Sequence, residues 1–148
     1  MYTFLKFLHL LAAIVWLGGM TFMLRALRPA LGETLEPPQR LPLLAGVLRR
    51  FFLLVWLAVV VILLSGGYLL GHAGAQAAPL GWHLMAGIGT LMCLIFGHIY
   101  FAPYRRLQAA VAAANWPEGG RLANQIALLV TVNFWLGWLA IAAITFLG

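Results

Sequence analysis

The chain has 148 residues, of which 64% are hydrophobic and only 8% are charged, whereas a soluble domain carries about 25% charged residues. A soluble protein of this length cannot bury so much apolar surface, so the composition excludes a water-soluble globule and predicts that lipid covers part of the molecule. The net charge of +6 is concentrated between apolar runs, which indicates membrane topology and argues against a nucleic-acid partner.

Four apolar runs are each long enough to cross a membrane, because about 20 residues of helix span a hydrocarbon core of about 30 Å. They cover residues 3–24, 50–71, 82–103 and 123–147. Inside lipid the backbone has to satisfy its own hydrogen bonds, so each run is expected to be a helix. The sequence therefore predicts an all-α, four-transmembrane-helix bundle that forms a single integral membrane domain over residues 1–148.

The first run contains an imidazole in an otherwise apolar stretch, FLHLLAAIVWLGGM. His9, Trp16 and Met20 are spaced so that they share one helical face. Polar side chains within spans usually turn toward the bundle interior, so we expect this face to point inward. Gly18 and Gly19 follow Trp16, and they either allow close helix contact or leave room for a flat cofactor.

Arginine is concentrated in the first and third connections. The residues concerned are Arg25, Arg28, Arg40, Arg49 and Arg50 in and around the first, and Arg105, Arg106 and Arg121 around the third. The middle connection, GHAGAQAAPLG, contains no Lys or Arg. The positive-inside rule then places the first and third connections in the cytoplasm and both termini on the outer side, which would be the periplasmic side if the membrane is a bacterial inner membrane.

The two inner connections differ in the local structure that they predict. The first contains Pro29, Pro37, Pro38 and Pro42, which favours a stiff, partly extended linker. Residues 41–50 are expected to resume as a short interfacial helix before the second span. The third connection is expected to begin as a helical overhang of the third span and to end near Asn115.

The remaining histidines lie on the second and third runs. His72 ends the second run and His83 begins the third, both near the outer side, whereas His98 lies about 22 Å further along the third helix. His9, His72 and His83 would thus gather in the outer half from three helices, which is how a metal or haem site is built in a bundle. His83 and Gly87 begin a stripe that we also expect to face the interior.

Four of these predictions leave an alternative open. For His72 we favour an interfacial role over a metal ligand, and His98 is either a ligand or a contact to a carbonyl, a quinone or a lipid headgroup. Met85 lies on a different helical face from His83, so it is a poor co-ligand for that histidine and serves a second site or packing. For Asn133, in the fourth span, an interhelical hydrogen bond is expected rather than a substrate contact.

Two cofactor chemistries fit this set of residues. Imidazoles on facing helices can hold a b-type haem, with His9 as one axial ligand, His83 as the favoured second one and His72 as the alternative, and with small residues making room for the ring. Histidine and methionine together suit Cu(I), which prefers soft ligands. No span contains Asp or Glu, so the sequence offers neither a carboxylate pair for acid–base catalysis nor a carboxylate ligand for zinc.

The residues also resemble a known family. The stretch LKFLHLLAAIVWLGGMTFMLRALRPAL resembles the first span of the CopD-like membrane proteins, and WHLMAGIGTLMCLIFGHIYFAPYRRL is similar to their third span. The first span also resembles that of the HemJ-type protoporphyrinogen oxidases. The CopD resemblance implies copper passage or resistance, and the HemJ resemblance implies a haem held by His9. Where the HemJ-like pattern has His-x-Lys, this chain has Met85 in the lysine position, which argues against oxidase activity.

Three functional hypotheses follow. The leading one is a small inner-membrane protein that binds one b-type haem and passes electrons between a membrane quinone and a periplasmic acceptor. The second is copper binding, transport or resistance, with a periplasmic copper partner. The third is a cofactor-free accessory subunit of a larger membrane complex. Under any of the three hypotheses, the many glycines within the spans are compatible with a homo-oligomer.

Overall fold

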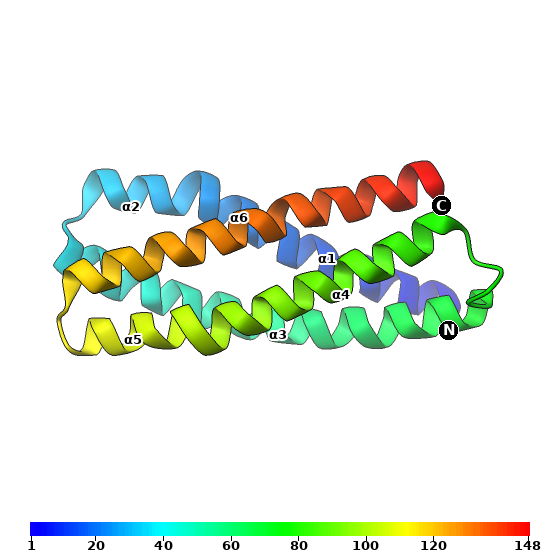
Figure 1. Ribbon diagram of the computed structural model, residues 1–148, viewed down its shortest axis with the longest axis horizontal. Coiled ribbons are helices and arrows are strands. Elements are labelled where there is room, and N and C mark those ends of the chain that lie inside the picture. The colour runs from blue at the N-terminus through cyan, green and yellow to red at the C-terminus, as the bar shows by residue number, and fades with distance from the viewer.

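The computed structural model describes residues 1–148, and four long helical rods account for nearly all of them (Figure 1). The first rod comprises α1 (Tyr2–Phe22), a π-helical stretch (Met23–Leu27) and α2 (Arg28–Thr34); the second is α3 (Pro37–Ala73). The third comprises α4 (Leu80–Ile99), a π-helical stretch (Tyr100–Tyr104) and α5 (Arg105–Ala112), and the fourth is α6 (Trp116–Leu147). All four rods are long and apolar enough to cross a membrane, which confirms the predicted all-α architecture.

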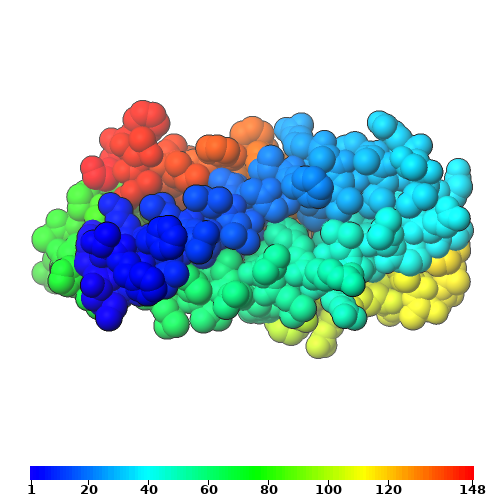
Figure 2. Space-filling view, turned by 180° about the vertical axis from the view of Figure 1, so that it is seen from behind, coloured from blue at the N-terminus to red at the C-terminus, as the bar shows by residue number.

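The rods lie side by side and alternate in direction. Both termini lie at one end of the bundle, here called the terminal end, and the α2–α3 and α5–α6 connections lie at the other, here called the basic end (Figure 1). α1 packs mainly on α3, and α4 packs mainly on α6. Figure 2 shows the first rod running along one face of the molecule, between α3 and the C-terminal part of α6. The predicted placement of both termini on one side follows from this arrangement, and their assignment to the outer side rests on the arginine pattern.

The predicted proline linker is wrong, because only residues 35–36 separate α2 from α3. Pro37 and Pro38 stand in the first turn of α3, where backbone N–H groups have no partner within the helix and proline therefore costs little. Pro42 lies in the next turn, inside the helix. The segment 41–50 is accordingly part of one continuous helix, not a separate interfacial one.

Two other prolines explain why the first and third rods change their winding. A proline ring clashes with the carbonyl four residues earlier in an α-helix. For Pro29 that carbonyl belongs to Arg25, within the first π-helical stretch, and for Pro103 it belongs to Ile99, directly before the second. The wider winding of a π-helix gives each ring room, so the rods continue where an α-helix alone would break.

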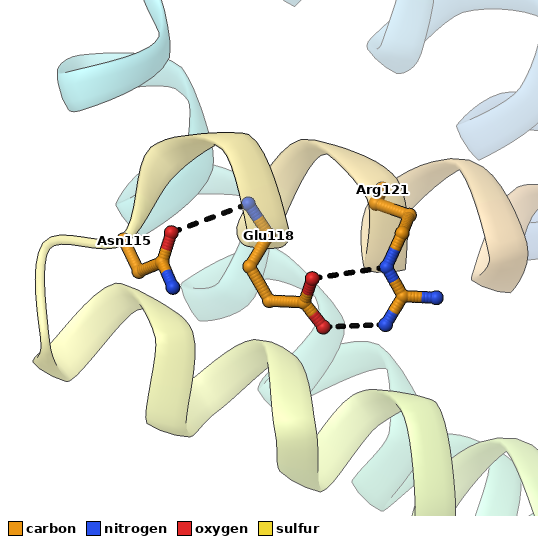
Figure 3. A network of polar contacts seen from close by, with 3 residues as sticks. All are labelled: Asn115, Glu118 and Arg121. Carbon is orange, nitrogen blue, oxygen red and sulfur yellow. Dashed lines mark hydrogen bonds and ion pairs between the residues drawn. The ribbon is translucent and has the colours of Figure 1, made fainter.

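The α5–α6 connection is short and well capped. α5 ends at Ala112, and Ala114 adopts a positive φ of 52° before the chain enters α6. Oδ1 of Asn115 accepts a hydrogen bond of 3.4 Å from the backbone N–H of Glu118, which closes the first turn of α6 (Figure 3). This confirms the helical overhang predicted to end near Asn115.

Aromatic rings pack the basic half of the bundle. Phe52, Phe96 and Tyr104 are buried. The ring centroid of Phe52 lies 5.4 Å from that of Phe96 and 4.9 Å from that of Tyr104, both edge to face, and Trp56 adds a third edge contact to Phe96 at 5.0 Å. Edge-to-face pairs of this kind each add about 0.5–1.5 kcal/mol beyond area burial. The terminal half has no comparable cluster, and a pocket lies there instead.

Candidate functional site

A pocket of about 560 Å³ lies in the terminal half, between α1, α3, α4 and α6. Its lining is mostly apolar, and it includes His9 and Trp16 of α1, Gly66 of α3, Met85 and Met92 of α4, and Gly137 of α6. No Asp, Glu or Cys lines it. Besides the cationic side chain of Lys6, the donor atoms that it offers to a ligand are an imidazole nitrogen, thioether sulfurs and two hydroxyl groups.

His9 is held by a hydrogen bond across the helix interface. Its Nδ1 lies 2.9 Å from Oγ of Ser65 on α3, and Ser65 is buried, with only 2% of its surface exposed. The Ser65 hydroxyl also lies within hydrogen-bond distance of the carbonyl of Val61 in its own helix, to which it can donate its single proton. In that arrangement Oγ accepts from His9, Nδ1 carries the ring proton and Nε2 keeps a free lone pair. That tautomer is the one in which imidazole binds a metal through Nε2.

Met85 and Met92 line the pocket from α4. They are seven residues apart and so lie on one helical face. Met92 is buried and Met85 is half-buried. The pocket therefore combines one nitrogen donor from α1 with two sulfur donors from α4.

The inward stripe predicted for the third span is wrong. His83 and Gly87 are exposed on the face of α4 that points away from the bundle interior, here called its outer face, and neither lines the pocket. Helical phase explains the error, because residues two apart point to nearly opposite sides and the inward side is taken by Met85. The pairing of His9 with His83 across a common pocket is thus not formed within the chain.

The stripe predicted for the first span is confirmed. Trp16 and Met20 are buried, with exposed fractions of 4% and 2%, and the Trp16 ring lies edge-on to Phe96 at 6.2 Å. Trp16 lines the pocket but Met20 does not. Gly18 is exposed, and Gly19 lies so close to Phe51 that an added Cβ would come within 2.6 Å of its ring. Gly18, Gly19 and Gly87 thus lie outside the pocket that we expected them to shape.

The other two histidines also lie outside the pocket. His72 is exposed, with its ring stacked on Tyr68 at 5.8 Å and tilted against Tyr2 at 5.5 Å, which fits the interfacial role that we favoured for it. His98 is exposed, and it lies in the last turn of α4, in the half of that helix nearer the basic end. No three His, Cys, Asp or Glu side chains come together anywhere in the chain, so the structure does not gather His9, His72 and His83 into one group.

Asn133 makes the interhelical hydrogen bond expected of it. Its Nδ2 donates to the backbone carbonyl of Met92 at 3.1 Å, and its side chain is buried. Oδ1 has no partner. The bond ties α6 to α4 at the position of a pocket-lining methionine, so Asn133 positions the pocket wall and is not part of its lining.

Sequence reasoning missed Ser65, Met92 and the glycines that open the pocket. Ser65 is the only serine in the chain and directly precedes Gly66 and Gly67, and a lone hydroxyl in an apolar span was a signal that could have been used. A Cβ at Gly66 would lie 3.2 Å from Cε1 of His9. A glycine is therefore needed there for the His9 ring to pack against α3.

The fold and this pocket define a multi-pass membrane protein whose spans enclose nitrogen and thioether donors. The family model described as Copper resistance protein D matches residues 45–147. The chain belongs to this CopD family, and the match covers most of α3 and all of α4 to α6. His9 precedes the matched residues, so the HemJ-like and CopD-like resemblance of the first span stays a prediction. No curated protein sequence and no solved structure matches the chain.

Proposed function

We propose that this protein binds copper, as Cu(I), in the pocket of the terminal half. Three properties support the proposal. The family to which the chain belongs is described by copper resistance, the pocket offers one imidazole and two thioethers, and Cu(I) prefers such soft ligands over carboxylates and water. His9, Met85 and Met92 are the proposed ligands.

The observation that carries the proposal is the bond between His9 and Ser65. A buried hydroxyl placed to accept from Nδ1 favours the tautomer with the proton on Nδ1, which leaves Nε2 free as a metal ligand. Partners of this kind orient metal-binding histidines and raise their basicity. An intramembrane imidazole is costly, and a bound metal would give it a function beyond the bond to Ser65.

The surroundings of the pocket favour the transfer or storage of copper over catalysis. No carboxylate lies in the spans to move protons. If the arginine-rich connections lie in the cytoplasm, as the positive-inside rule predicts, the pocket lies in the outer half of a bacterial inner membrane. A periplasmic copper partner would then have the shorter path to His9.

A second candidate is the b-type haem of the leading sequence hypothesis. Its specific support is the room beside His9, where Gly66, Gly67 and Gly89 line the pocket and leave space of the kind that a flat ring requires. His9 would be one axial ligand, and Met85 replaces His83 as the candidate for the other. Bound haem would supply one-electron chemistry, with a quinone and a periplasmic acceptor as the proposed partners.

The test is a metal analysis of the protein purified in detergent. Copper and iron are quantified in one sample, and oxidised and dithionite-reduced spectra are recorded. We expect about one Cu(I) per chain with no Soret band, and loss of that copper in His9→Ala. The control is His72→Ala, which removes an exposed imidazole outside the pocket and is expected to retain copper.

The other outcomes distinguish the alternatives. A sharp reduced α-band with bound iron that His9→Ala abolishes would replace copper by haem. Full copper binding by a correctly folded His9→Ala variant would overturn the assignment of the ligand. Absence of both metals from protein reconstituted with copper and with haem would leave the third hypothesis, a cofactor-free subunit that co-purifies with a larger complex.

A further inference from the structure

A second and smaller pocket lies at the basic end, far from His9. It has a volume of about 220 Å³ and lies between α2, α3 and the start of α6. Its polar lining consists of Arg28, Arg40 and Asn124, and its apolar floor is formed by Leu31, Leu41 and Leu44, which are buried. None of these residues takes part in the proposed copper site.

The two arginines of this pocket have no anionic partner. Nη2 of Arg28 donates to Oδ1 of Asn124 at 2.8 Å, which is a neutral acceptor, and Arg40 makes no hydrogen bond from its side chain. Both are half-buried, and Arg40 is close enough for its charge to act on Arg28. Two like charges that share a partly desolvated pocket repel each other, so the pocket is stabilised by an anion that lies between them.

The acidic residues of the chain do not supply that anion. Glu118, at the start of α6, is bound by the forked guanidinium of Arg121, through Nε at 2.9 Å and through Nη2 (Figure 3). This is the only ion pair in the chain. Glu33 and Glu36 are exposed at the connection between α2 and α3 and pair with neither arginine.

The pocket is open to an incoming anion at two glycine positions. Gly32 and Gly120 line it, and a Cβ added at either would meet no atom within 4 Å, so neither position is closed by packing. Guanidinium groups bind phosphate through paired N–H donors. Basic pockets between spans on the cytoplasmic side are also where anionic lipid headgroups bind.

We propose that Arg28 and Arg40 form a binding site for a phosphate group at the basic end of the bundle. The group is either the phosphodiester of an anionic phospholipid, whose acyl chains would continue along the apolar surface, or a soluble phosphate. Arg40 is a direct ligand. Arg28 is also a ligand, and Asn124 holds its guanidinium in place.

The test compares thermal unfolding midpoints of delipidated protein in detergent with added phosphatidylglycerol, phosphatidylcholine or inorganic phosphate. The variants are Arg40→Gln and, as the control, Arg25→Gln, which neutralises an exposed arginine of the first rod that lies outside the pocket. We expect phosphatidylglycerol or inorganic phosphate to raise the midpoint of the unmodified protein and of Arg25→Gln. For Arg40→Gln, the rise in midpoint at the same additive concentration should be smaller, because binding weakens by about fivefold, the equivalent of the about 1 kcal/mol that a basic residue near a lipid surface contributes.

The two additives separate the sources of the phosphate. Stabilisation by phosphatidylglycerol alone identifies a lipid headgroup, and stabilisation by inorganic phosphate as well identifies a soluble anion site. Without either additive, Arg40→Gln should unfold at the same temperature as the unmodified protein or higher, because one of two repelling charges is gone. Equal responses of Arg40→Gln and Arg25→Gln to both additives would overturn the proposal, as would a large loss of midpoint in Arg40→Gln without additive.

Discussion

Helices α1 and α4 each carry a histidine near the terminal end, but the two side chains lie in opposite environments. His9 turns inward, is bound by Ser65 and lines a pocket, whereas His83 is exposed on the outer face of α4. On α4 the inward positions are taken by Met85 and Met92. A histidine in a span is therefore not by itself a ligand, and what matters is the side of the helix on which it lies and the group that holds its second nitrogen.

The largest expected effect tests which side of α4 faces inward. Phe96 is 2% exposed and contacts Trp16, Phe52 and Trp56, whereas Leu94 is 69% exposed. We expect Phe96→Ala to lower the free energy of unfolding by about 3 kcal/mol, which is the lower end of the usual range for a buried Phe→Ala substitution. The lower end is expected because the apolar surface of Phe96 is exposed to lipid, not to water, when the helices separate. Leu94→Ala should change it by less than about 0.5 kcal/mol. Denaturant unfolding in mixed micelles measures both, and equal losses would mean that the outer face of α4 is also packed.

This division of α4 marks the limit of what the sequence could predict. Apolar length and the arginine pattern were sufficient for four spans, because a backbone in lipid has almost no alternative to a helix. Periodicity also placed His9, Trp16 and Met20 on one face correctly. It grouped the residues of α4 equally well but could not say which group turns inward. That choice depends on contacts with Trp16 and with Phe52, which are distant in the sequence.

The same limit explains the error in the first connection. Four prolines predicted an extended linker, yet α2 and α3 are separated by two residues only. The cost of Pro37 and Pro38 to the helix depends on their position in its first turn. The cost of Pro29 depends on the change to π-helical winding before it. Neither can be judged from proline density.

The second prediction tests the group that holds His9. Ser65→Ala removes the acceptor of the Nδ1 proton and frees the ring to rotate, so we expect Cu(I) affinity to fall by about 10- to 100-fold, as for other outer-shell partners. The matched control is Thr131→Ala, because Thr131 also bonds a carbonyl in its own helix but lies outside the pocket. Competition with a chromophoric Cu(I) chelator measures the affinity. A Ser65→Ala variant with unchanged affinity would show that His9 does not depend on this bond.

The third prediction concerns the inward methionines of α4. Met85→Leu keeps the volume of the side chain and removes the sulfur, and we expect Cu(I) affinity to fall by about tenfold, since one soft ligand is lost. Met20→Leu is the control, because Met20 is buried on α1 but does not line the pocket. The chelator competition applies again. Equal affinities of the two variants would exclude the Met85 sulfur from the copper site.

The smallest expected effect is that of His83→Ala, and it tests whether His83 belongs to a cofactor site at all. An exposed imidazole on the outer face of α4 cannot share a ligand with His9 unless that helix turns by about half a rotation, which would expose Met85, Met92 and Phe96 instead. Such a rotation would break the edge contacts of Phe96 with Trp16, Phe52 and Trp56. We therefore expect copper content and affinity in His83→Ala to equal those of the unmodified protein. A haem held by the pair His9 and His83 would instead be lost both from His83→Ala and from His9→Ala. Metal content and absorption spectra of the two variants, measured side by side, decide whether α4 contributes its histidine or its methionines.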